Sequence, residues 1–112
     1  ERAVDGARRA TVQISDCRQC AYVVASSVAK VVVARCADVR VRVAARLVTD
    51  TLEVLDARGD VLVELCVPVS TLVVSGGGPD AVVTVRVRDA GRFERLITER
   101  GAHCVVRGDD ER

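Results

Sequence analysis

Cysteine carries the widest chemical repertoire in this chain, and two of its five cysteines, Cys17 and Cys20, form a Cys-x-x-Cys pair. A structural zinc site needs a second such pair or histidines at matching spacing, but the other three cysteines are scattered and His103 is the only histidine. A redox thiol is activated at a helix N-terminus, whereas Cys17 falls at a strand corner. An odd number of scattered cysteines is typical of free thiols in a reducing compartment. We therefore expect no metal, no cofactor and a cytoplasmic location.

Catalytic constellations are equally sparse. The Gly76-Gly77-Gly78 run is followed by neither Lys-Ser/Thr nor a helix, so it lacks the parts of a phosphate cradle and is interpreted as a loop. General acid–base or nucleophilic catalysis needs a base beside a nucleophile. His103 lies near the end of the chain, and the carboxylates fall at expected corners and in the tail. The sequence therefore predicts a protein that is not an enzyme.

Arginine is the remaining functional signal. The net charge is only +1, which disfavours nucleic acid as a partner, and no apolar run reaches the ~18 residues of a membrane span. Exposed arginines form either a solvated face or a flat protein-binding surface, since arginine is enriched at interfaces. The candidates for protein binding are Lys30, Arg40, Arg42, Arg46, Arg86 and Arg88. We expect Lys30, Arg40 and Arg42 on neighbouring rungs of the fold.

The elements that must position these residues are strands. The chain has 25 valines against one Phe, one Tyr and no Trp or Met, and β-branched side chains favour strands. Apolar residues alternate with polar ones in Val39–Val43 and Val83–Arg88. Successive side chains of a strand point to opposite faces, so the valines face a thin core and the arginines face outward.

An internal repeat organises these strands. Apolar positions superpose at intervals of 19 residues, and each period holds two short strands divided by a polar corner. The superposed sets are Ile14, Val33 and Leu52, then Cys17, Cys36 and Leu55, and after a shift of about one residue Leu72 and Val74 answer Leu52 and Val54. So short a unit cannot bury its own apolar face, and stacking the copies gives a coil of parallel strands. We expect an all-β solenoid of about five rungs in preference to an antiparallel sandwich.

The length suits one domain. We expect an N-terminal leader or first partial strand in residues 1–11, a coiled core in 12–89 and an irregular C-terminal segment in 90–112. In that segment Phe93, Leu96 and Ile97 have helical spacing, and Gly101 would end a short helix. Val105-Val106 is the last apolar pair before a charged tail.

A family resemblance supports the coil. Val12–Cys20 and its copy Val31–Val43 look like the CARP repeat, which is shared by cyclase-associated proteins and the tubulin-folding cofactor C family. Val28–Thr49 and Val73–Val85 resemble late rungs of the cyclase-associated protein domain. The resemblance implies a right-handed parallel β-helix.

The resemblance also implies a function. It points to a cytoskeletal domain that binds actin monomers and assists their nucleotide exchange, with a homodimer formed by exchange of the C-terminal segment. The candidates for that dimer arm are Phe93, Leu96, Ile97, Val105 and Val106. A cofactor C-like action on tubulin or a small GTPase, with Arg46 as the arginine finger, is the first alternative. The second is a structural solenoid that self-assembles through its open strand edges.

Overall fold

The computed structural model describes residues 2–4, 10–67, 69–88, 95–101 and 103–108 of the chain. Every regular element in these ranges is a strand, so the described residues hold no helix that could cross a membrane. The strands are β1 (Arg2–Val4), β2 (Thr11–Ser15), β3 (Arg18–Val24), β4 (Lys30–Ala34), β5 (Ala37–Val43), β6 (Thr51–Leu55), β7 (Val61–Leu65), β8 (Thr71–Gly76), β9 (Val82–Val87), β10 (Arg95–Gly101) and β11 (His103–Gly108).

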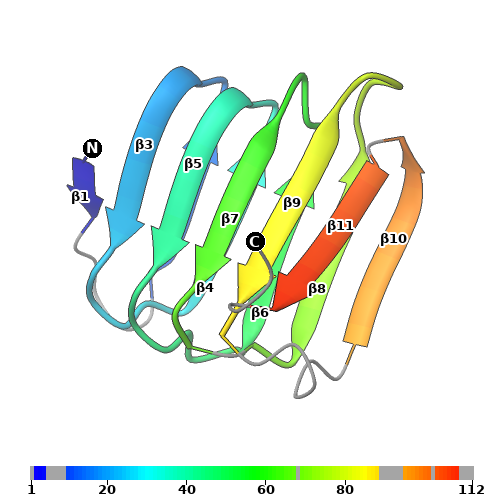
Figure 1. Cartoon of the computed structure of the whole chain (residues 1–112). Helices are drawn as coiled ribbons and strands as arrows, with labels where there is room; N and C mark the ends of the chain where they lie inside the picture. The colour runs from blue at the N-terminus through cyan, green and yellow to red at the C-terminus, as the bar shows by residue number, and fades with distance from the viewer. Residues whose placement is uncertain (1, 5–9, 68, 89–94, 102, 109–112) are drawn as a thin grey trace.

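The chain winds these strands into two parallel sheets that face each other (Figure 1). Sheet A has the order β1-β3-β5-β7-β9-β11, and sheet B has the order β10-β8-β6-β4-β2. Odd and even strands alternate along the chain, so each rung consists of one strand from sheet B followed by one from sheet A. The fold is the expected right-handed parallel β-helix.

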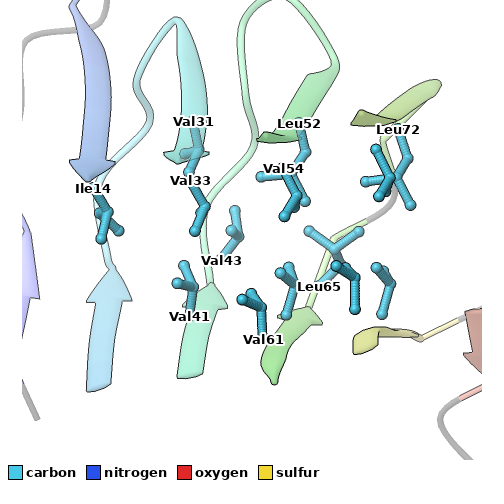
Figure 2. Close-up of a cluster of buried hydrophobic side chains, with 14 of the residues drawn as sticks. Ile14, Val31, Val33, Val41, Val43, Leu52, Val54, Val61, Leu65 and Leu72 are labelled. Atoms are coloured by element: carbon cyan, nitrogen blue, oxygen red, sulfur yellow. The ribbon is translucent and has the colours of Figure 1, made fainter. Parts of the chain in front are cut away.

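The core lies between the sheets and consists of stacked aliphatic side chains (Figure 2). Val31 of β4 stacks on Leu52 of β6, and Val41 of β5 stacks on Val63 of β7; all four are fully buried. Alternation along each strand sends every second side chain inward, and no charged or polar residue is buried among the described ones. The valine-rich composition thus produces the thin core that the sequence predicts.

A tight corner joins each sheet B strand to the next sheet A strand. One residue there adopts a positive φ in four successive rungs; these residues are Asp16 (56°), Arg35 (53°), Asp56 (50°) and Gly76 (69°). The backbone amides of the first three donate hydrogen bonds to the following rung, as in Asp16 N–H to the Ala34 carbonyl at 3.0 Å. The residue after each is small, namely Cys17, Cys36, Ala57 and Gly77, and the side chains of Cys17, Cys36 and Ala57 pack in or against the core. Cys17 and Cys36 therefore stack in a narrow corner, as the repeat predicts. The third member of that predicted set is wrong, because Leu55 pairs with Ala34 and Ala57 occupies the corner instead.

The register differs from the predicted 19-residue repeat beyond the second rung. Ile14 does pair with Val33, but Val33 pairs with Val54, and Leu52 pairs with Val31. The predicted superposition of Leu52 on Val33 is therefore wrong by two residues, which the wider corner between β5 and β6 absorbs. A register shift of two residues keeps every side chain on its own face of the sheet, so it cannot be detected from the apolar pattern. The predicted pairing of Leu52 with Leu72 is confirmed.

The C-terminal segment is more regular than the sequence suggests. The short helix expected through Leu96 and Ile97 is wrong, because residues 95–101 form β10 and pair with β8. Strand β11, which contains Val105 and Val106, pairs with β9. Pairing satisfies the open backbone edges of β8 and β9, which outweighs the helical spacing. Phe93 lies outside the described residues.

Candidate functional site

The outer face of sheet A gathers the charged residues of the solenoid. Alternation in β5 turns Asp38, Arg40 and Arg42 to solvent while the valines between them are buried. The pairing of β5, β7, β9 and β11 then aligns such residues across the strands into three columns. The acidic column contains Asp38 and Asp60, the middle column contains Arg40, Leu62, Thr84 and Val105, and the basic column contains Arg42, Glu64, Arg86 and Arg107.

A shallow, open hollow of about 650 Å³ lies across these columns. Its outward-facing lining residues are Asp38, Arg40, Asp60, Leu62, Val82, Thr84, Arg86 and Arg107. Carboxylates thus stand at one end and the guanidinium groups of Arg86 and Arg107 at the other. A floor of Leu62 and Thr84, together with the Arg40 side chain, which is ion-paired with Glu64, lies between them. Such a surface offers orientation through its charges and contact area through its floor, which suits recognition of another molecule rather than bond chemistry.

Internal ion pairs neutralise only part of this face. The Arg40 Nε lies 3.7 Å from the Glu64 Oε1, and the Arg40 side chain remains 58 % exposed. An exposed pair at this distance contributes little to stability. Within the described ranges, Arg86 and Arg107 have no ion-pair partner. Both guanidinium groups are therefore available for a ligand.

The structure separates the arginine candidates that the sequence grouped together. Arg40, Arg42 and Arg86 share the outer face of sheet A, and Arg88 is exposed directly after β9. The expectation that Lys30 lies on a rung next to Arg40 and Arg42 is wrong: β4 and β5 belong to the same rung but to opposite sheets, and Lys30 forms an ion pair with Glu53. Each rung has two outer faces, one on each sheet, so knowing the rung of a residue does not determine its face.

Arg46 lies apart from both faces, in the corner between β5 and β6. Its side chain is 79 % exposed, and its Nε lies 3.8 Å from the Asp50 Oδ1. The Ser27 hydroxyl donates a hydrogen bond to the Arg46 carbonyl at 2.6 Å, which fixes the backbone of this corner to the preceding rung.

Sequence reasoning missed the acidic column and Arg107. The sequence places the carboxylates in general at solvated corners and in the tail, and Arg107 in the C-terminal segment outside the coiled core. A signal for Asp38 was present, because it continues the alternation of Arg40 and Arg42 by one more step. Arg107 reaches the basic column only because β11 pairs with β9 and sets it opposite Arg86.

A second polar cluster lies at the N-terminal end of the coil, where the Cys17 Sγ is 3.3 Å from the Tyr22 hydroxyl. The hydrogen bond to Cys17 is the largest cause, and burial the second, of a pKa of Tyr22 that is raised to about 12. Burial likewise raises the pKa of the Cys36 thiol, so that thiol is a poor nucleophile at neutral pH. In the described part of the chain, no group of three or more His, Cys, Asp or Glu side chains is placed to hold a metal ion.

Fold and site together define a right-handed β-helix with acidic and basic side chains at opposite ends of a hollow on one of its two sheets. Comparison with known proteins adds no closer identity: no family model, curated protein or solved structure matches the chain.

Proposed function

We propose that this protein is a cytoskeletal binding domain that engages a protein partner through the outer face of sheet A. The observation that carries the proposal is the hollow itself, with guanidinium groups and carboxylates at its two ends and a floor of Leu62 and Thr84. Arginine and apolar side chains together are typical of protein interfaces, and a flat solenoid face offers extended contact area.

Monomeric actin is the partner that the resemblance to cyclase-associated proteins favours. The two segments that carry this resemblance, Val28–Thr49 and Val73–Val85, contain β4–β5 and most of β8–β9. These segments contribute the Arg40, Arg42 and Thr84 positions of the proposed face. Binding there would assist nucleotide exchange on actin and so promote filament turnover.

Titration of labelled, ADP-bound monomeric actin with the protein tests this proposal. We expect saturable binding at or below tens of micromolar, weakened by Arg86→Gln, which removes a guanidinium group from the hollow, and unchanged by Arg58→Gln, which removes an exposed arginine outside the hollow. Absence of binding at tens of micromolar, by monomer and by dimer alike, would refute actin as the partner. Equal loss in both variants would refute the assignment to this face.

A cofactor C-like action is the second candidate, and the exposure of Arg46 favours it. A guanidinium group that is 79 % exposed at a corner can reach into the site of another protein, as an arginine finger does. This function predicts faster GTP hydrolysis by tubulin or a small GTPase, with the acceleration lost in Arg46→Ala. Sedimentation velocity across a concentration series separates both candidates from end-to-end self-assembly, which predicts a sedimentation coefficient that rises continuously with concentration.

A further inference from the structure

Two like-charged pairs lie side by side on the outer face of sheet A. Arg107 of β11 is directly opposite Arg86 of β9. Asp38 and Asp60 precede the paired residues Val39 and Val61, so the two carboxylates also occupy neighbouring positions. Like charges at directly opposite positions destabilise a sheet. The two ends of the hollow therefore carry repulsion of opposite sign.

Elsewhere the solenoid matches its charges across neighbouring rungs. Arg35 donates two hydrogen bonds to the carboxylate of Asp16, at 2.9 and 3.0 Å, and Lys30 forms an ion pair with Glu53. Charge pairing between rungs is thus available to this fold. The hollow is matched only in part: Glu64 forms an ion pair with Arg40 and lies opposite Arg86 on its other side. Among the described residues Arg107, Asp38 and Asp60 have no ion-pair partner, which indicates that these charges are retained for a ligand.

The separation of the two pairs defines the size of that ligand. Along a strand the acidic and basic columns are four residues apart, as from Asp38 to Arg42, which is about 13 Å at 3.3 Å per residue. Arg86 and Arg107 also lie two strands further along the sheet than Asp38 and Asp60, about 10 Å at ~4.8 Å per strand, so the two pairs are about 16 Å apart. Leu62 and Thr84 form the floor between them. An extended peptide laid diagonally across the hollow has its first and fifth side chains on the same side, about 13 Å apart, and the length of the Lys and Glu side chains covers the remaining distance.

We propose that the hollow binds an extended, dipolar segment of the partner, with a carboxylate held by Arg86 and Arg107 and a cationic side chain over Asp38 and Asp60. This assignment rests on the proposed function, because it describes the contacts of the partner on that face. A carboxylate between two guanidinium groups forms charge-assisted hydrogen bonds and removes the repulsion between them. The cationic side chain does the same at the acidic end.

Two double variants test the proposal on the free protein and on its complex with monomeric actin. Arg86→Gln/Arg107→Gln neutralises the basic end. Asp38→Asn/Asp60→Asn neutralises the acidic end and keeps a residue that tolerates the φ of 55° at position 38. We expect each variant to raise the melting temperature of the free protein and to weaken actin binding about tenfold or more. The control Arg58→Gln should leave actin binding unchanged and should not raise the melting temperature, because Arg58 attracts the Asp16 carboxylate.

A peptide probe makes the test independent of actin. The first peptide places Lys and Glu four residues apart on an alanine and valine background, and the second contains the same residues with Lys and Glu adjacent. In an NMR titration, we expect the amide chemical shifts of residues around the hollow to change saturably when the first peptide is added and to stay unchanged with the second. These changes should be lost in Arg86→Gln/Arg107→Gln. If actin fails to bind while the spaced peptide binds, the proposed function fails and the dipolar site stands. Equal responses to both peptides, or binding that survives both double variants, would overturn the site.

Discussion

Gly76→Ala tests the corner that turns the chain from one sheet to the other. Gly76 has a φ of 69°, and a Cβ at this position would collide with the Oδ1 of Asp56 in the preceding rung. Gly78 is the matched control two residues away, because it lacks a positive φ and a Cβ there meets nothing within 4 Å. The two substitutions add the same methyl group to the same loop, but only the first opposes the folded backbone.

The expected difference in stability between the two variants contains only the terms that they do not share. Either Gly→Ala change stabilises the fold by about 0.4–1 kcal/mol through the unfolded chain alone, so this contribution disappears from the comparison. The left-handed conformation costs an alanine roughly 1–2 kcal/mol, and displacement of the Asp56 side chain adds to it. Gly76→Ala should therefore be less stable than Gly78→Ala by at least about 1–2 kcal/mol, or roughly 4–10 °C in melting temperature.

Urea unfolding followed by circular dichroism measures this difference directly. We expect a lower midpoint for Gly76→Ala at an unchanged m-value, and a midpoint at or above that of the unmodified protein for Gly78→Ala. Equal midpoints for the two variants would refute the corner geometry. Destabilisation by Gly78→Ala alone would show that the positions of the turn residues are misassigned.

Three further predictions concern the core, the corner ion pair and the N-terminal cluster. Val63→Thr keeps the shape of a fully buried side chain but buries a hydroxyl group. It should lower the free energy of unfolding by about 1–3 kcal/mol in the same urea assay. An unchanged free energy of unfolding would contradict the inward orientation of Val63. The hydrogen bond from Arg35 lowers the pKa of Asp16, so the pair stabilises the fold above the unfolded-state pKa and this contribution is lost as pH falls through the folded-state pKa. Arg35→Gln should raise the pKa of Asp16 in an NMR titration, and an unchanged value would exclude the pair. The pKa of Tyr22, raised from 10.0 to about 12, implies stability that is present below pH 10 and lost between about pH 10 and 12; Cys17→Ala should lower the pKa in a phenolate absorbance titration of this single tyrosine, and no change would exclude the thiol as the cause.

Most of the fold could be predicted because its rules are local. Alternation in Val39–Val43 determines which side chains face inward, and the small residues at Cys17 and Cys36 mark the narrow corner. The candidate site was only partly predictable. Arg40, Arg42 and Arg86 follow from alternation, whereas the choice between two outer faces depends on which sheet a strand joins.

The sequence by itself determined the strands, their inward and outward faces, and the stacking of short repeats into a coil, because these follow from a side-chain period of two residues. The tertiary structure alone decided the register. Two extra residues in one corner change the pairing partner of Val33 from Leu52 to Val54 and leave every side chain on the same face. The alternation of apolar residues therefore does not reveal the shift. It also decided the C-terminal rung, because open edges on β8 and β9 can be satisfied only by strands. That rung places Arg107 beside Arg86 and so completes the basic end of the hollow.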